Sequence, residues 1–268
     1  MENMITIKDI LSILTIRRKI FIQVEQLSKL GGYKGAINGK RLVEVFGLIG
    51  MISRYGMPWD FIKHYINAAT INSIDTTLRF KAIICYMQHT NATVYTLDKL
   101  LSHLWYEGGG SEDDDDDGFK ELKDHLNTQH FDVIVKNNRL DILQYINDRH
   151  LKDNNNNNKE GKGGGRIIRV TKQAFDNACE RRDNLELITF LHNTGNTCTS
   201  LAMDIAACYG NINIIQFLYL NRSEGCSVYA VNDAATAGHI ETIKYLFEIG
   251  YKECSKSAMD RYVTVQYY

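Results

Sequence analysis

The chain has 268 residues, of which 44% are apolar, so it can bury a core in one large domain or two smaller ones. Its single proline, against an average usage of about 5%, argues against turn-dense β-sandwiches and favours an all-α protein. The net charge is −1, and without the acidic residues 112–117 only a weak positive excess remains. That excess is too small for the basic footprint of a nucleic-acid-binding protein.

The N-terminal residues lack the basic and apolar segments of a signal peptide, and no stretch approaches the roughly 18 consecutive apolar residues of a membrane span. The six cysteines form no CxxC motif and no zinc-ligand spacing. We therefore expect reduced thiols and a cytoplasmic protein, with a nuclear location left open. No cofactor, metal, membrane or nucleic-acid partner is expected.

Residues 1–106 are predicted to form a helical N-terminal block. Apolar periodicity indicates helices over residues 11–30, 40–55, 58–69, 76–89 and 96–106. Pro58 suits the first position of the third helix, where no backbone N–H is needed. The block is either a set of degenerate repeats or a separate domain. Residues 107–118, rich in glycine and aspartate, are predicted to be a linker or exposed loop.

A unit of 28 residues recurs within residues 119–268. Its columns hold an alanine, an acidic or amide residue, a second alanine, and a cysteine followed by a hydroxyl residue. The columns are Ala174, Ala202, Ala230 and Ala258; Asp176, Asp204, Asn232 and Asp260; Ala178, Ala206 and Ala234; and Cys198–Thr199, Cys226–Ser227 and Cys254–Ser255. Self-similarity at a fixed period is typical of repeat proteins.

A more divergent copy lies upstream, over residues 134–146. An insertion of 17 residues separates it from the next copy and contains an Asn- and Gly-rich tract at about residues 152–166. Because such low-complexity composition cannot bury a core, the tract is predicted to be disordered.

Each unit is predicted to contain two short helices, over residues 202–209 and 212–220 in the best-preserved copy. Gly210 and Gly238 stand between the helices, where a left-handed cap is favoured. Asn138 tolerates that conformation but Arg182 does not readily adopt it, so the Arg182 turn should differ from the others. Since one pair cannot bury its apolar face, the units are expected to stack into a helix-turn-helix solenoid.

The run Ala234-Ala235-x-x-Gly238-His239-Ile240 resembles the core of the ankyrin repeat, and the resemblance extends over about residues 131–268. It implies a solenoid that binds other proteins and has no catalytic activity of its own. Three departures are evident. The period is 28 rather than 33 residues, the copy that starts at Ala258 ends before a second helix, and the Thr-Pro-Leu-His motif is replaced by residues 201–204 and 229–232. Asp or Asn is expected to substitute by bonding local backbone.

Three motifs that would indicate a specific ligand or bond are rejected. Residues 113–124 nearly fit an EF-hand calcium loop, but Asp124 replaces the bidentate glutamate and Lys120 occupies an apolar position. Residues 31–41 lack the first glycine and the Ser or Thr of a phosphate-binding loop. The cysteine column is expected to hold structural thiols, since helices packed about 8–10 Å apart are too distant for disulfides. No nucleophile–base set stands out, so an enzyme is not expected.

The leading hypothesis is a non-catalytic scaffold protein that binds an unidentified protein partner through exposed positions that vary between units. The partner-binding candidates are Tyr209, Asn211, Asn213, Asn221, Arg222, Glu224, Ala237, His239 and Glu241. The alternative is a truncated family member with little binding of its own, whose incomplete last repeat exposes apolar surface and self-associates. A third, less favoured reading is an enzyme carried by the N-terminal helical block.

Overall fold

The computed structural model describes residues 47–54, 56–66, 73–104, 119–157 and 166–267. The chain divides into two compact units, residues 1–51 and 52–268. Of the first unit the structure describes only residues 47–51, which are helical. The described ranges contain helices and no strand, so the prediction of an all-α chain is confirmed for them.

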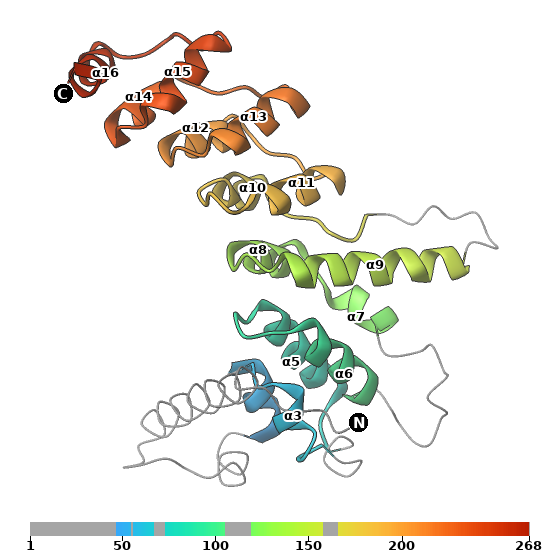
Figure 1. Ribbon diagram of the computed structural model, residues 1–268. Coiled ribbons are helices and arrows are strands. Elements are labelled where there is room, and N and C mark those ends of the chain that lie inside the picture. Colours follow the sequence, from blue (N-terminus) through green and yellow to red (C-terminus); the bar gives the residue numbers. More distant parts are fainter. Residues whose placement is uncertain (1–46, 55, 67–72, 105–118, 158–165, 268) are drawn as a thin grey trace, which may run out of the picture. The chain divides into compact units, whose positions relative to one another are not determined.

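The second unit is built mainly from helix pairs that follow one another along the chain (Figure 1). Its helices are α3 (Trp59–Ile62), α5 (Thr76–Gln88), α6 (Val94–Leu104), α7 (Phe119–His125), α8 (Thr128–Lys136), α9 (Leu140–Asn157), α10 (Lys172–Ala178), α11 (Leu185–Asn193), α12 (Leu201–Cys208), α13 (Ile212–Asn221), α14 (Val228–Ala237), α15 (Ile240–Glu248) and α16 (Lys256–Tyr267). The pair predicted over residues 202–220 is confirmed to within one residue at each end.

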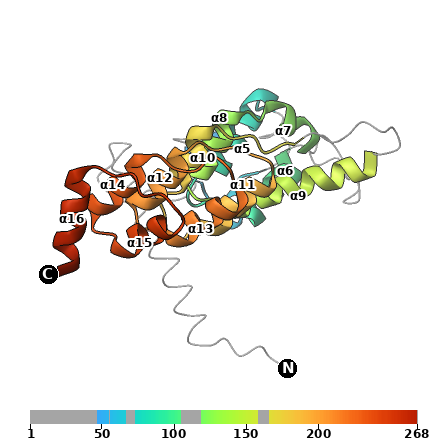
Figure 2. The ribbon, with the colours of Figure 1, turned by 90° about the horizontal axis from the view of Figure 1, so that it is seen from above.

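The pairs stack in register, because the first helix of each pair contacts the first helices of its neighbours. These contacts run from α5 to α8, α10, α12, α14 and α16, while the second helices α6 and α9, and α11, α13 and α15, contact one another in the same way. The view from above places the two sets of helices in two rows (Figure 2).

The recurring alanines explain how closely the first helices approach. Ala202 and Ala206 of α12 and Ala230 and Ala234 of α14 are at most 1% exposed. A methyl side chain lets two helix backbones come near each other while still excluding water. The second helices contribute the larger apolar side chains of the core, among them Ile214, Ile215, Leu218, Ile243 and Leu246.

The turns within the pairs also follow the sequence. Gly210, Gly238 and Asn138 adopt left-handed backbone, with φ of 70°, 78° and 52°. Arg182 is not in that region, and residues 179–184 separate α10 from α11, against residues 209–211 between α12 and α13. The predicted difference of the Arg182 turn is confirmed.

Two of the helices predicted in the N-terminal block are confirmed, since α5 and α6 match residues 76–89 and 96–106 to within two residues. The helix predicted over residues 58–69 is wrong in its extent. Pro58 is the N-cap of the four-residue helix α3, and residues 63–65 form a turn in which the Tyr65 N–H bonds the Ile62 carbonyl. Residues 47–54 of the helix predicted over 40–55 are helical, and residues 11–30 lie outside the described residues.

The predicted disorder at about residues 152–166 is wrong for its first part, because α9 continues to Asn157. Extending an existing helix is far easier than starting one, so an asparagine tract can follow a nucleated helix despite its poor propensity. Residues 158–165 are outside the described part, as are residues 107–118. The chain is described again from Arg166, and Ile168 is fully buried.

Candidate interaction surface

A polar clasp joins each unit to the next. A side chain in the first helix of one pair accepts hydrogen bonds from the hydroxyl residue at the N-terminal end of the next pair's first helix. The four clasps are Asp132–Thr171, Asp176–Thr199, Asp204–Ser227 and Asn232–Ser255. The three carboxylates each accept a backbone N–H at 2.8–2.9 Å and a hydroxyl at 2.7–2.8 Å.

The fourth clasp is weaker, because the Asn232 amide oxygen accepts only the Ser255 backbone N–H, at 2.8 Å. The sequence had suggested that this Asp or Asn column bonds local backbone. The partner instead lies 23 residues further on, in the following unit. Half-burial raises the pKa of Asp204 above its ordinary value, and the two bonds from Ser227 oppose that rise.

A second set of contacts begins at the residue after each left-handed turn. The Arg139 guanidinium donates to the carbonyl oxygens of His89, Thr90 and Ala92, at 2.9 and 3.1 Å for the first two, and pairs with Asp141. Arg139 thereby ties the α8–α9 pair to the end of α5.

The Asn211 amide makes the equivalent connection one pair further on. It donates to the carbonyl oxygens of Cys179 and Glu180, at 2.7 and 2.9 Å. These contacts fix the turn of each pair against the turn before it.

His239 makes the corresponding contact by packing its ring against the preceding turn. Its ring lies against Gly210, where an added Cβ would come within 2.8 Å of the His239 Nδ1 atom. The same arrangement recurs at Gly56 and His89, with an added Cβ 2.5 Å from the His89 Nδ1 atom. Gly210 therefore has two reasons to be glycine, its positive φ and the histidine ring that covers it.

Replacing Gly210 with alanine should lower the melting temperature more than replacing Gly238. Both glycines have left-handed backbone, which disfavours alanine by about 1 kcal/mol. Nothing lies within 4 Å of a Cβ at Gly238, whereas Gly210 faces the His239 ring, so Gly210→Ala should lose about 1 kcal/mol more. Thermal unfolding followed by circular dichroism gives both values. Equal losses in the two variants would contradict the His239 contact.

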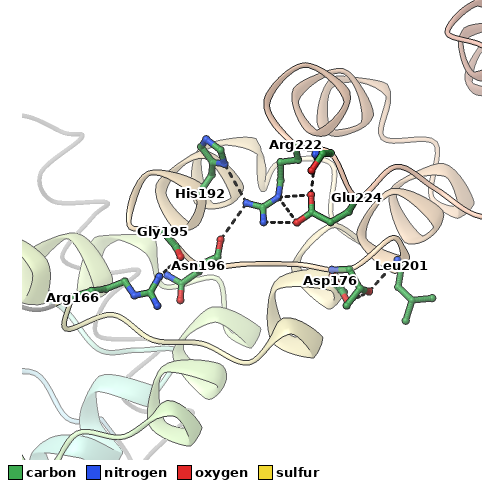
Figure 3. Close-up of polar contacts among 10 residues, drawn as sticks. Arg166, Asp176, His192, Gly195, Asn196, Leu201, Arg222 and Glu224 are labelled. Carbon is green, nitrogen blue, oxygen red and sulfur yellow. Dashed lines mark hydrogen bonds and ion pairs between the residues drawn. The ribbon is translucent and has the colours of Figure 1, made fainter.

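Arg222 is the centre of a third inter-unit contact (Figure 3). Its guanidinium pairs with Glu224 at 2.8 Å, donates to the Asn196 carbonyl oxygen at 3.2 Å and lies 3.2 Å from the His192 Nδ1 atom. It also stands 5.2 Å from the centre of the Phe175 ring, within cation–π range. The side chain is 9% exposed. The hydrogen bond from Arg222 lowers the pKa of Glu224, which stays ionised.

The structure separates the nine partner-binding candidates into two groups. Six are exposed: Tyr209, Asn213, Asn221, Glu224, Ala237 and Glu241. The expectation of exposure is wrong for Asn211, which is 4% exposed, and for the Arg222 side chain. Glu224 is committed to Arg222, and His239 is half-buried against Gly210. Because the side chains of Asn211, Arg222, Glu224 and His239 contact neighbouring residues, their variation between units does not mark a free surface.

The exposed candidates do not form one cluster. Tyr209 and Ala237 end the neighbouring first helices α12 and α14, whereas Asn213 and Glu241 lie in second helices and Asn221 precedes the junction between pairs. Interaction with Glu180 raises the pKa of Tyr209. Glu241 pairs with Lys244 at 2.9 Å.

A groove of about 450 Å³ runs between the first helices α8 and α10. Val133 and Lys136 line it from α8, and Gln173, Asn177 and Arg181 from α10 and the turn after it. None of these five residues is among the predicted partner-binding residues. Their only signal in the sequence was the pair of small residues Ala174 and Ala178, which leave room beside α8.

Burial makes two of the thiols poor nucleophiles. All six cysteines are free, and burial raises the pKa of Cys198 to about 11 and that of Cys226 to about 12. Such thiols are protonated at neutral pH and react slowly. Within the described ranges no group of three or more His, Cys, Asp or Glu residues is placed to hold a metal ion. Of the calcium-loop pattern at residues 113–124, residues 113–118 lie outside those ranges and residues 119–124 belong to α7. The phosphate-loop pattern at residues 31–41 lies outside them.

Taken together, the described residues form an all-α array of stacked helix pairs with repeated polar contacts between pairs. None of the described helices has both the length and the apolar character needed to cross a bilayer. No protein-family model, curated protein or solved structure matches the sequence. The function is therefore argued from the residues and contacts above.

Proposed function

We propose that the chain is a divergent, ankyrin-like repeat protein that binds a protein partner through the exposed face of its first helices, without catalysis. One observation carries the proposal. The recurring positions are buried or engaged between units, whereas the exposed positions of the first helices differ from unit to unit. The exposed column Gln173, Leu201, Tyr229 and Ser257 illustrates this difference.

A second exposed column, Arg181, Tyr209 and Ala237, is equally varied. A rigid scaffold with variable exposed side chains is the arrangement that repeat proteins use for recognition. Exposed tyrosines strengthen the proposal, because tyrosine is enriched at protein interfaces and gives large contact area at low entropic cost. Tyr229 is 62% exposed and Tyr209 is 45% exposed.

The repeat array is proposed to extend upstream of residue 119. The α5–α6 pair contacts α8 and α9 as later pairs contact each other. His89 covers Gly56 as His239 covers Gly210, which supports reading residues 52–104 as degenerate repeats rather than a separate domain. The α5–α6 pair would then add to the same binding face.

The experiment is affinity capture from lysate with the full chain, followed by mass spectrometry. A first-face variant carries Leu201→Glu, Tyr209→Glu and Tyr229→Glu. The matched control introduces the same three charges at exposed apolar positions of second helices, as Leu151→Glu, Tyr219→Glu and Leu220→Glu. We expect the unmodified chain and the control to retain the same specific proteins, and the first-face variant to lose them.

Circular dichroism and thermal unfolding should give the same helix content and melting temperature for all three proteins, because the substituted residues are exposed. Retention of partners by the first-face variant, or their equal loss in the control, would contradict the assignment of the face. If the unmodified chain captured no specific protein, the binding function itself would be contradicted.

A further inference from the structure

The groove between α8 and α10 is lined by two acidic and two basic side chains, and not all of them bind another group of the protein. One of its two carboxylates is committed, because Asp132 accepts the backbone N–H and the hydroxyl of Thr171 at 2.8 Å each, whereas Glu180 is exposed. Its two cations, Lys136 and Arg181, are exposed and form no ion pair or hydrogen bond with any residue that the structure describes. Among the charged side chains of the groove without such a partner, the cations therefore outnumber the carboxylates by two to one.

The two cations stand on different helices of the groove. Lys136 is the last residue of α8, and Arg181 lies just beyond the end of α10. Each is therefore close to a helix C-terminus, where the helix dipole favours a positive charge. On α10, Gln173 donates its side-chain amide to the Asn177 side-chain oxygen at 2.9 Å. That contact leaves the Asn177 amide nitrogen as a hydrogen-bond donor in the groove lining.

We propose that this groove binds an acidic peptide segment of the partner protein, with carboxylates paired to Lys136 and Arg181 and a peptide carbonyl accepting from Asn177. The inference rests on the proposed function and names the chemistry of the partner. A groove of about 450 Å³ is in the usual range of about 300–1,000 Å³ for ligand pockets and accommodates a short segment. Arginine and lysine bound to carboxylates give strong, charge-assisted hydrogen bonds.

A nucleic acid is a poorer fit for the same groove. Affinity for a phosphate backbone comes from several cations that neutralise successive phosphates. Here two cations are accompanied by the carboxylates of Asp132 and Glu180 in the lining, which would repel neighbouring phosphates. A peptide can place its acidic side chains at the two cations and neutral backbone beside the carboxylates.

The test is fluorescence anisotropy of the full chain with labelled decapeptides of alternating Glu and Ala, Gln and Ala, or Lys and Ala. We expect only the Glu–Ala peptide to bind. The variant Lys136→Glu with Arg181→Glu should weaken binding by on the order of 10- to 100-fold, as for lost hydrogen bonds between charged groups. Binding should also weaken as salt rises.

The matched control is Lys81→Glu with Lys252→Glu, which changes the net charge by the same amount at exposed lysines outside the groove. It should leave the affinity unchanged. Equal or tighter binding of the Gln–Ala or Lys–Ala peptide, an equal loss in the control, no binding of the Glu–Ala peptide, or tighter binding of a single-stranded oligonucleotide would each overturn the proposal. In those cases partner capture that depends on Leu201, Tyr209 and Tyr229 would leave the binding function standing.

Discussion

Replacing Asp176 with alanine is expected to lower the free energy of unfolding by about 3 kcal/mol, the loss of two hydrogen bonds to a charged group. The carboxylate is 1% exposed and holds the backbone N–H and hydroxyl of Thr199 at 2.9 and 2.7 Å. Its removal leaves both donors without their partner at the junction of two units. Urea denaturation followed by circular dichroism measures the loss. The exposed Asp148 is the control, and Asp148→Ala should change stability by less than about 0.5 kcal/mol.

Two further substitutions test the clasp in both directions. Asp176→Asn should lose about half as much as alanine, because the Asn232 clasp shows that an amide still accepts the backbone N–H. Asn232→Asp should gain about 1 kcal/mol at neutral pH, since a second oxygen becomes available to the Ser255 hydroxyl. A destabilising Asn232→Asp, or an Asp176→Ala no worse than the Asp148 control, would contradict the role of the clasps.

The second large effect is expected at Arg139. Its side chain is 12% exposed and bonds three carbonyl groups besides Asp141, so Arg139→Ala should lose about 3 kcal/mol. Arg139→Lys should lose most of the same amount, because an ammonium cannot reproduce the fork of the guanidinium. Denaturation measures both losses. In both variants, amide hydrogen exchange should become faster around residues 86–92 than in the unmodified chain, with a smaller change within α14.

The exposed Arg261 in α16 provides the control for Arg139. Arg261→Ala should leave stability within about 0.5 kcal/mol of the unmodified chain. If Arg139→Lys were as stable as the unmodified protein, the carbonyl contacts would not be what holds the α8–α9 pair to α5. Faster exchange spread evenly over all helices would point to global destabilisation rather than a local junction.

Repetition explains which parts of the fold were predictable. The alanine columns and the turn residues Gly210, Gly238 and Asn138 occupy the same place in each unit, and one physical constraint, close helix packing or left-handed backbone, decides them. The two helices of the best-preserved unit, α12 and α13, were therefore predicted to within one residue at each end. The helix predicted over residues 58–69 belongs to no clear repeat, and its apolar pattern alone did not fix its end.

The partners of the polar columns were harder to predict. The acidic column and the hydroxyl column were both visible in the sequence, 23 residues apart, but their pairing across units depends on how the helices stack. Arg139 and Asn211 each follow a left-handed turn, but they are polar and differ in residue type. That pattern is also typical of exposed residues. Their burial follows from the turn of the preceding pair, and no sequence period encodes that geometry.

The groove between α8 and α10 depends on a distance that the sequence does not contain. Residues 137–171, which include α9 and the insertion, lie between these two helices. The fixed period that relates the other units is therefore lost there. Ala174 and Ala178 gave the only local signal. Only the packed structure shows that Lys136 and Arg181 are exposed beside the groove and that Asp132 is bound to Thr171.

Hydrogen–deuterium exchange of the full chain, measured with and without a captured partner, tests the central claim most directly. The account predicts slower exchange in the first helices α10, α12 and α14 when the partner is bound, with α11, α13 and α15 unchanged. Slower exchange confined to the second helices would contradict binding through the first-helix face.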